Sequence, residues 1–245
     1  MLESNADLND SQILGLLESL PGDDETAQRT IFDIGANHGQ SVSSFLRRFP
    51  SATIHAFEPN PAAYHQLLQN YGELPNVHCH RLALGDACGP TKFHSTRLSE
   101  VASLLRPAPV LVERSGSDKY DFEMISVEMA TLDKFCEKHA VAHIDLCKID
   151  VQGAESRVLS GARSMLQNHR IALIYMEATF SETYEGQSDF RRVYNLLSDM
   201  QYVLWDFMPR QYVQCGRIWY ADVIFASQSS FHLIDAAHRD QPNSN

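Results

Sequence analysis

The sequence predicts an α/β fold: a doubly wound sheet of seven mostly parallel strands, with one antiparallel strand inserted near the C-terminal end. Short apolar runs typical of buried strands alternate with helix-periodic segments up to about residue 200. A tight polar link then joins two final apolar runs, which is typical of an antiparallel hairpin. The 245 residues are enough for a substantial core.

The first half of the chain supplies three strands and three helices. Leucines at helical spacing give the first segment an apolar face, and Pro21-Gly22 ends it. Glycines after the next apolar run allow a sharp turn into a helix, and Pro59-Asn60-Pro61 starts another. We predict helices at 10–20, 40–48 and 62–71, and strands at 31–34, 52–57 and 76–84.

The second half supplies the remaining four strands. Thr131 can cap a helix, Gln152-Gly153 turns the chain after a strand, and an apolar stripe at Val193, Leu196 and Leu197 marks a third helix. We predict helices at 131–139, 154–167 and 190–200, and strands at 144–150, 171–177, 202–207 and 218–226.

The stretch between the two halves has a different character. Residues 89–120 are rich in Ser and Pro and weakly periodic, with a possible strand at 91–94, and residues 124–128 alternate like an exposed edge strand. Loops this long in a compact domain are usually functional or disordered, so we expect a cover over the substrate. We divide the chain into a helical extension at 1–28, one domain at 29–232 and a flexible tail at 233–245.

Composition limits the partners and the compartment. The net charge of −11 argues against binding nucleic acid or an anionic membrane, both of which need clustered Lys and Arg. No apolar run reaches the length of a membrane span. Five scattered cysteines without a C-x-x-C pair indicate reduced thiols and a cytoplasmic protein. The first helix can pack on the domain or mediate a homodimer.

The segment Thr30 to Gly39 is the main candidate for a ligand site. A strand, a glycine turn and a helix N-terminus direct backbone N–H groups at a ligand, and Glu58 ends the next strand, where an acid can bind two ribose hydroxyls. The glycine spacing G-x-x-x-G does not fit a dinucleotide, and the carboxylate of Asp33 before the turn suits a sulfonium or ammonium. This pattern points to S-adenosylmethionine. The alternative is an ordinary turn whose glycines serve only the backbone.

Acids end four of the predicted parallel strands. Asp33, Glu58, Asp150 and Glu177 therefore meet at one edge of the sheet, where ligands bind in such folds. Carboxylates at close quarters repel one another, so we expect something cationic among them. Lys148, within one of these strands, either reaches an acid from a packed stem or has a catalytic role.

Six short pieces of the chain form an ordered set of motifs: Ile-Phe-Asp-Ile-Gly-Ala-Asn-His-Gly (31–39), Phe-Glu-Pro-Asn-Pro (57–61), Leu-Ala-Leu-Gly-Asp (82–86), Thr-Leu-Asp (131–133), Lys-Ile-Asp-Val-Gln-Gly-Ala-Glu (148–155) and Val-Leu-Ser-Gly-Ala (158–162). In this order, the six pieces resemble the FkbM-type S-adenosylmethionine-dependent methyltransferases, which have the Rossmann-like class I fold. One departure is Gln152, where the family usually has Glu; this weakens a role for that acid in binding a cation or positioning substrate.

The resemblance implies a cofactor site and a reaction. The methionine end lies along the first glycine turn, Glu58 holds the ribose, and Ala83 and Leu84 flank the adenine. The reaction is methyl transfer to a hydroxyl group of a small-molecule natural product or sugar. The cofactor-binding residues are expected to be Asp33, Gly35, Ala36, Asn37, Gly39, Glu58, Asn60, Ala83, Leu84 and Asp150.

Transfer of a methyl group to a hydroxyl also needs a proton acceptor. Candidates are Asp150, Glu155, Glu177 and His94. Asp150 and Glu177 end neighbouring strands, so they can share a proton or a divalent cation such as Mg²⁺, and we leave the metal open. Two other functions stay under consideration: a nicotinamide-dependent oxidoreductase on the same topology, and a protein that binds the cofactor without catalysis.

Overall fold

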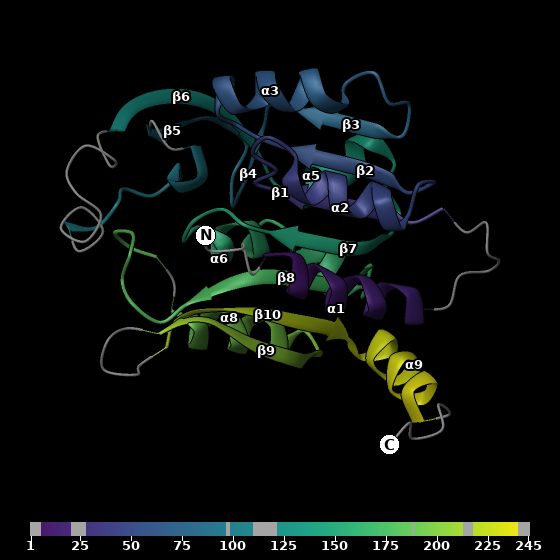
Figure 1. Ribbon diagram of the computed structural model, residues 1–245. Coiled ribbons are helices and arrows are strands. Elements are labelled where there is room, and N and C mark those ends of the chain that lie inside the picture. Colours follow the sequence, from purple (N-terminus) through teal and green to yellow (C-terminus); the bar gives the residue numbers. More distant parts are fainter. Residues whose placement is uncertain are drawn as a thin grey trace.

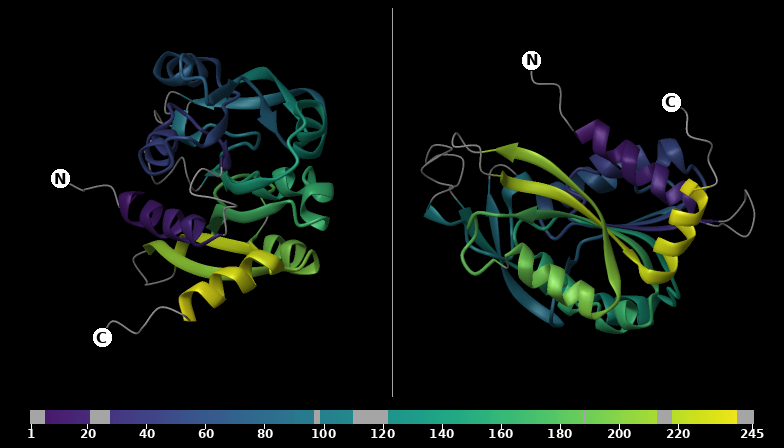
Figure 2. Two further views of the ribbon diagram at one scale, coloured as in Figure 1. Left: turned by 90° about the vertical axis from the view of Figure 1, so that its right-hand side faces the viewer. Right: turned by 90° about the horizontal axis from the view of Figure 1, so that it is seen from below.

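The computed structural model describes residues 6–20, 28–96, 99–109, 122–187, 189–212 and 218–239. A seven-stranded sheet runs through the molecule with helices on both faces (Figures 1 and 2). In spatial order its strands are β3 (Val77–His80), β2 (Thr53–Phe57), β1 (Thr30–Ile34), β7 (Ile144–Ile149), β8 (Ile171–Thr179), β10 (Ile218–Ser227) and β9 (Tyr202–Tyr212).

The directions of the strands confirm the predicted topology. All neighbours from β3 to β8 pair in parallel, whereas β10 is antiparallel to both β8 and β9. The arrow of β10 accordingly points the opposite way to that of β7 in Figure 1. Because the chain folds back at the end of β9, a single strand is reversed and the carboxyl ends of the parallel strands share one edge.

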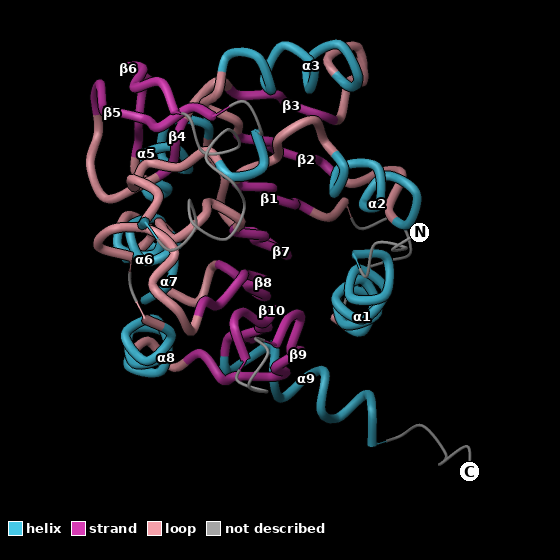
Figure 3. Tube along the Cα trace, turned by 60° about the vertical axis from the view of Figure 1, so that its left-hand side comes forward, coloured by secondary structure: helices cyan, strands magenta, loops and turns pink. Residues whose placement is uncertain are grey.

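Side chains alternate between the two faces of each strand, and each face has its own apolar core. In β1, Ile31 packs in one core, and Phe32 and Ile34 pack in the other. Figure 3 shows α1, α2 and α9 on one side of the sheet and α6, α7 and α8 on the other. The first core includes residues of α1 (Ala6–Ser19), α2 (Gln40–Arg48), α3 (Pro61–Tyr71) and α9 (Gln228–Arg239); the second includes residues of α5 (Leu132–His139), α6 (Glu155–Ser160), α7 (Arg163–Gln167) and α8 (Phe190–Asp199).

A second, three-stranded sheet corrects two predictions. It consists of β4 (Ala83–Leu84), β6 (Phe122–Ala130) and β5 (Gly89–Thr96), in that order. The single strand predicted at 76–84 is wrong, because the chain turns after His80 and β4 pairs with β6 instead of β2. The strand predicted as an exposed edge at 124–128 pairs with β5 and, at its end, with β4. The apolar pattern suggested one continuous strand because Leu84 is buried in the main core, although it belongs to the second sheet.

The helix predicted at 154–167 is broken into α6 and α7. A Cβ atom on Gly161 would lie 2.0 Å from the carbonyl oxygen of Gly85, so the close approach of these two backbones requires glycine here. The carboxylate of Asp133 then accepts hydrogen bonds from the backbone N–H groups of Ser164 (2.8 Å) and Met165 (2.9 Å). These bonds satisfy the first turn of a new helix.

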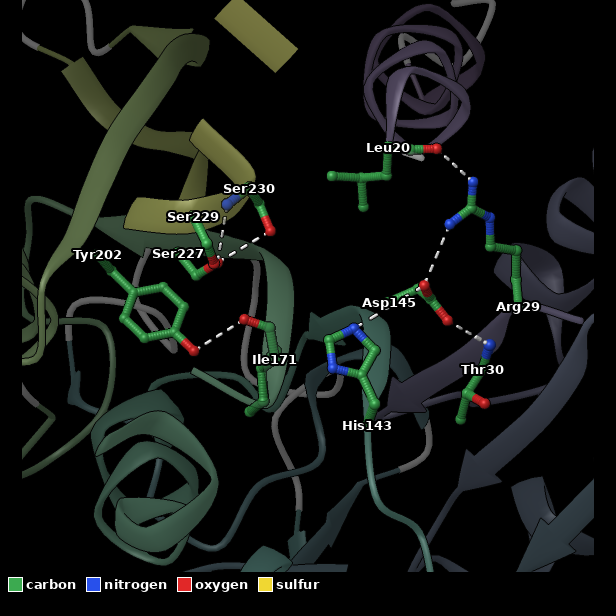
Figure 4. A network of polar contacts seen from close by, with 10 residues as sticks. All are labelled: Leu20, Arg29, Thr30, His143, Asp145, Ile171, Tyr202, Ser227, Ser229 and Ser230. Carbon is green, nitrogen blue, oxygen red and sulfur yellow. Dashed lines mark hydrogen bonds and ion pairs between the residues drawn. The ribbon is translucent and has the colours of Figure 1, made fainter. Parts of the chain in front are cut away.

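Both terminal segments are packed on the domain. Ile13 and Leu17 of α1 and Ile234 of α9 are fully buried. The helix α9 extends to Arg239, although the sequence predicted a flexible tail from residue 233. Arg29 donates to the carbonyl oxygen of Leu20 (2.6 Å) and to Asp145 at the start of β7 (3.2 Å), as Figure 4 shows. Residues 240–245 lie outside the described part of the chain. Over the described residues, no helix is both long enough and apolar enough to span a membrane.

Candidate active site

A cavity of about 760 Å³ opens at the carboxyl edge of the parallel strands. Small-molecule sites typically occupy about 300–1,000 Å³. Its walls come from the turns after β1, β2 and β7, the end of β8, the start of β10 and the segment 99–104. The cavity therefore lies where an α/β sheet of this topology binds its ligand.

The turn after β1 forms one wall. Gly35 has a φ of 85° and Asn37 a φ of 48°, and the N–H groups of Gly35 and Ala36 both donate to the carbonyl oxygen of Phe57 at 3.0 Å. A Cβ atom on Gly35 would lie 1.9 Å from the carbonyl oxygen of Asp150. Gly39 also has a positive φ, but it packs against Tyr71 and does not line the cavity. The positive φ and the close packing on Tyr71 are therefore enough to explain why residue 39 is glycine, without a role in binding a ligand.

Glu58 lines the cavity directly after β2. Its Oε2 accepts a hydrogen bond from the N–H of Asn37 (2.9 Å) and its Oε1 from the N–H of Asn60 (2.8 Å). Burial raises the pKa of Glu58 to about 7, although these backbone hydrogen bonds oppose the shift. Each carboxylate oxygen has further acceptor capacity, so the group is oriented to bind two neighbouring hydroxyls.

Asp33 lies behind the cavity and does not line it. Its side chain is fully buried, and its Oδ1 lies 3.1 Å from Nζ of Lys148. The same ammonium group lies 3.5 Å from Oδ2 of Asp150, which does line the cavity. The cationic group expected among the strand-end acids is thus in part the protein's own lysine, which reaches an acid from within the sheet.

The described part of the predicted cover connects two turns of the site. Ser99, in the 3₁₀ helix η1 (Ser99–Val101), donates to the side-chain oxygen of Asn37 at 2.8 Å. Ser103, which is buried, donates to the carbonyl oxygen of Gln152 at 2.8 Å. The cover therefore bridges the turns after β1 and β7 and closes one side of the cavity. Residues 97–98 and 110–120 of the predicted excursion lie outside the described residues.

A family model for the methyltransferase FkbM domain matches residues 33–204 of the chain, from the end of β1 into β9. This chain belongs to the FkbM methyltransferase family. The resemblance deduced from the sequence motifs is therefore confirmed.

Two relatives named as methyltransferases agree with this membership, and a solved structure shares the fold. The chain is 34% identical over 199 residues to the 2-O-methyltransferase NoeI of Sinorhizobium fredii, covering 78% of this chain and 77% of NoeI. It is 26% identical over 165 residues to the hexuronic acid methyltransferase AglP of Haloferax volcanii, covering 66% and 60% of the two chains. An rRNA methylase from Streptococcus thermophilus has the same fold, with a TM-score of 0.50, 9% identity and coverage of 93% and 98%.

Most of the residues that the FkbM resemblance assigned to the cofactor do lie together. Ala83 and Leu84 form an apolar wall of the cavity. Asn60 is buried outside it: its Oδ1 caps α3 by accepting from the N–H of Ala62 (3.0 Å), and its Nδ2 donates to Ser95. The predicted residues that line the cavity are Gly35, Ala36, Asn37, Glu58, Ala83, Leu84, Asp150 and Glu177.

Two of the candidate proton acceptors do not reach the cavity. Glu155 is buried beneath the turn after β7, where its Oε1 accepts from the N–H of Gly153 at 3.0 Å, and burial raises its pKa to about 7. His94 lies on β5 with its ring 5.0 Å from that of Phe122, and burial lowers its pKa. Asp150 and Glu177, the other two candidates, do line the cavity.

The opposite wall contains residues that sequence reasoning missed. Tyr175 of β8 donates from Oη to Oδ2 of Asp222 of β10 at 2.7 Å, and both line the cavity. Asp222 also lies directly opposite Glu177 in the register of these strands. The hairpin was predicted, but its register was not, and the register decides which acid faces the site.

The described residues contain no group of three or more His, Cys, Asp or Glu arranged to hold a metal ion. A divalent cation between Asp150 and Glu177 would have to sit beside the ammonium group of Lys148, 3.5 Å from Asp150. The acids and the lysine therefore fit a charged organic ligand better than a bound cation.

Proposed function

We propose that this protein transfers a methyl group from S-adenosylmethionine to a hydroxyl group of a sugar or small natural product. The observation that carries the proposal is Glu58, held by two backbone N–H groups at the cavity of an FkbM-family chain. That carboxylate suits the paired hydroxyls of a ribose, and neutral apolar residues flank it on the side where an adenine would lie.

The residues that line the cavity fit the successive parts of this cofactor. Gly35, Ala36 and Asn37 would hold its methionine end, Glu58 its ribose, and Ala83 and Leu84 its adenine. When bound, the cofactor supplies a methyl group on a positively charged sulfur, which departs as a neutral thioether. The nearby carboxylate of Asp150 stabilises this positive charge. The stabilisation is only partial, because the ammonium group of Lys148 lies beside the same carboxylate.

Asp150 is the proton acceptor in this proposal. Its side chain is 42% exposed, so its carboxylate reaches into the cavity from the turn after β7. It would take the proton of the acceptor hydroxyl, and the bound cofactor would supply the methyl group that replaces this proton on the oxygen. Glu177 and the Tyr175–Asp222 pair orient the acceptor in line with the breaking bond.

The relatives support a sugar as the acceptor. NoeI is a 2-O-methyltransferase and AglP acts on a hexuronic acid, according to their names. The carboxylates and the tyrosine on the wall around Glu177 offer hydrogen-bond partners for several hydroxyls of one acceptor. A cytoplasmic location and a homodimer through the N-terminal helix stay predictions from the sequence.

Calorimetric titration with S-adenosylhomocysteine and with NAD tests the proposal first. We expect binding of S-adenosylhomocysteine and none of NAD; the opposite result would favour the oxidoreductase. A panel of neutral sugars, uronic acids and phenols is then assayed for release of S-adenosylhomocysteine. Binding without release from any acceptor would leave a protein that holds the cofactor without catalysis.

A further inference from the structure

We infer that Gln152 is a positioning residue that holds the carboxylate of Asp150 in the orientation needed to take the acceptor's proton. This role rests on the proposed function, in which Asp150 is the proton acceptor. It assigns a use to the position at which the chain departs from the FkbM pattern, where an amide replaces the usual carboxylate.

The side chain of Gln152 joins Asp150 to a buried tyrosine. Its Nε2 donates to Oδ1 of Asp150 at 2.8 Å, and its Oε1 lies 3.2 Å from Oη of Tyr184. A carboxylate only accepts hydrogen bonds, so the amide must direct its NH₂ group at Asp150 and its carbonyl oxygen at the tyrosine hydroxyl. The single hydroxyl proton of Tyr184 is shared between this amide oxygen and the carbonyl oxygen of Val101, which lies 3.1 Å from Oη, so the donor to Asp150 is the contact that the amide itself supplies.

The backbone around Gln152 is fixed from several sides. Its φ is 54°, and its carbonyl oxygen accepts from Ser103 of the cover at 2.8 Å. Tyr184 is 3% exposed and packs on Gly153, where a Cβ atom would come within 3.1 Å of the ring. The amide is therefore attached at a point that the cover and Tyr184 both hold, which is the condition for a preorganised site.

Asp150 receives a donor on each oxygen. Gln152 is hydrogen-bonded to Oδ1, while the ammonium group of Lys148 lies 3.5 Å from Oδ2. Each oxygen has another lone pair for the incoming proton. A methionine at position 152 would fill about the same space and would remove this hydrogen bond to Oδ1 of Asp150.

The test compares Gln152→Met and Gln152→Asn with the wild-type enzyme on one acceptor. Gln152→Met keeps the size without the donor to Asp150. Gln152→Asn keeps the amide and tolerates the φ of 54°, but it is one methylene shorter and does not reach Asp150 in the same way. We expect kcat to fall by about 10- to 100-fold in both, the range for a catalytic group misplaced by about 1 Å. The acceptor KM and the dissociation constant of S-adenosylhomocysteine should stay within about twofold, since neither depends on proton transfer.

Gln187→Ala is the matched control for general loosening. Gln187 holds the same region, since its Oε1 accepts from the N–H groups of Thr183 (3.0 Å) and Tyr184 (2.9 Å), but it does not line the cavity. This variant should melt at a lower temperature and keep its kcat within about threefold, because no donor to Asp150 is lost.

Three results would overturn the assignment in distinguishable ways. An active wild-type enzyme whose Gln152→Met variant keeps its kcat shows that the donor to Asp150 is irrelevant. A Gln187→Ala variant that loses as much kcat as Gln152→Met shows that the effect is general loosening. A wild-type protein that binds S-adenosylhomocysteine but releases none from any acceptor removes the proposed function itself, and this role with it.

Discussion

Nζ of Lys148 lies 3.1 Å from Oδ1 of Asp33, a residue with no exposed surface on the neighbouring strand. The two residues are opposite each other in the parallel register of β1 and β7, so their side chains share one face of the sheet. In this ion pair Lys148 neutralises the charge of Asp33 beneath the cavity. Asp150, at its rim, is therefore the acid that a positively charged ligand meets, and Asp33 supports the site from below.

Replacing Lys148 with Met should strongly destabilise the fold. The variant removes the positive charge beside a fully buried carboxylate, and breaking one partner of a buried ion pair costs about 3–5 kcal/mol. Urea unfolding measures the loss. The Asp33→Asn/Lys148→Met double variant should recover much of it, because no buried charge then lacks compensation. A single variant as stable as the wild type would contradict the structural role of the pair.

Replacing Glu58 with Gln should weaken binding of S-adenosylhomocysteine. The amide nitrogen of Gln would face a backbone N–H that now donates to the carboxylate, and it accepts no hydrogen bond from a ribose. Losing hydrogen bonds to a charged group costs about 1.5–3 kcal/mol, or about 10- to 150-fold in affinity. Calorimetry at pH 8 provides the comparison.

The same residue predicts a pH dependence. The pKa of Glu58 is about 7, raised by burial, so the carboxylate is ionised above that pH and takes up a proton below it. Hydroxyl donors favour the ionised form; affinity for S-adenosylhomocysteine should therefore fall as the pH drops from 8 to 6. In Glu58→Gln this dependence should disappear. An equal slope in both proteins would assign the titration to another group.

The fold was predictable where the apolar pattern of a strand also indicates which strand it pairs with. Strand–helix alternation and a polar link fixed the reversed strand β10, and the acid after β2 located Glu58. The 76–84 prediction failed because alternation identifies buried residues without identifying the strand they pair with. Asp33 was misplaced for a similar reason: its position beside Lys148 depends on the register of two strands more than a hundred residues apart in the sequence.

Other site residues carried no local signal. Tyr175 and Asp222 face the cavity together only because β8 and β10 pair in this register, and a shift of β10 by one residue would turn Asp222 to the other face of the sheet. The hydrogen bonds of Gln152 join turns that are far apart along the chain. Such contacts follow from tertiary packing and not from residue type or spacing.

A histidine cluster at the edge of the main sheet should make stability sensitive to acid. Nδ1 of His55 lies 3.1 Å from Nε2 of His80, and the rings of His78 and His139 are close by. Burial and these neighbouring histidines lower the pKa of His55 to about 3, and burial lowers that of His80 to about 4. The unfolded chain takes up these protons near pH 6.5, so the free energy of unfolding should decrease as the pH falls from about 6.5 to 4.

The variant His55→Phe isolates this contribution. A phenylalanine keeps the aromatic packing on Phe32 and Phe135, whose rings lie 5.0 and 5.6 Å from that of His55, and cannot be protonated. Between pH 6 and 4 the free energy of unfolding should fall less steeply in the variant than in the wild type. The difference between the two slopes should be up to about 1.4 kcal/mol per pH unit. Urea unfolding at these pH values provides the measurement. Parallel pH profiles of the two proteins would show that His55 does not set the acid limit.

The glycine at the cavity should tolerate no side chain, and a second glycine offers a matched control. Gly35 and Gly186 have φ values of 85° and 75°, but a Cβ atom would lie 1.9 Å from the carbonyl oxygen of Asp150 at the first and has nothing within 4 Å at the second. Gly186→Ala should therefore cost only about 1–2 kcal/mol of backbone strain. Gly35→Ala should cost more and abolish cofactor binding in calorimetry. Equal effects at both sites would mean that backbone conformation alone sets the requirement.

Removal of divalent cations should leave methyl transfer unchanged. Each carboxylate oxygen of Asp150 has a donor of the protein's own nearby, Gln152 at 2.8 Å and the ammonium group of Lys148 at 3.5 Å. A cation shared with Glu177 would have to approach the positive charge of Lys148. Lys148 cannot move away from such a cation, because the buried carboxylate of Asp33 would then lose its ion-pair partner. Turnover measured in EDTA should match turnover with Mg²⁺ in excess. If activity disappears in EDTA and returns with Mg²⁺, Lys148 does not supply the positive charge at this edge of the cavity, and Asp150 acts as a metal ligand.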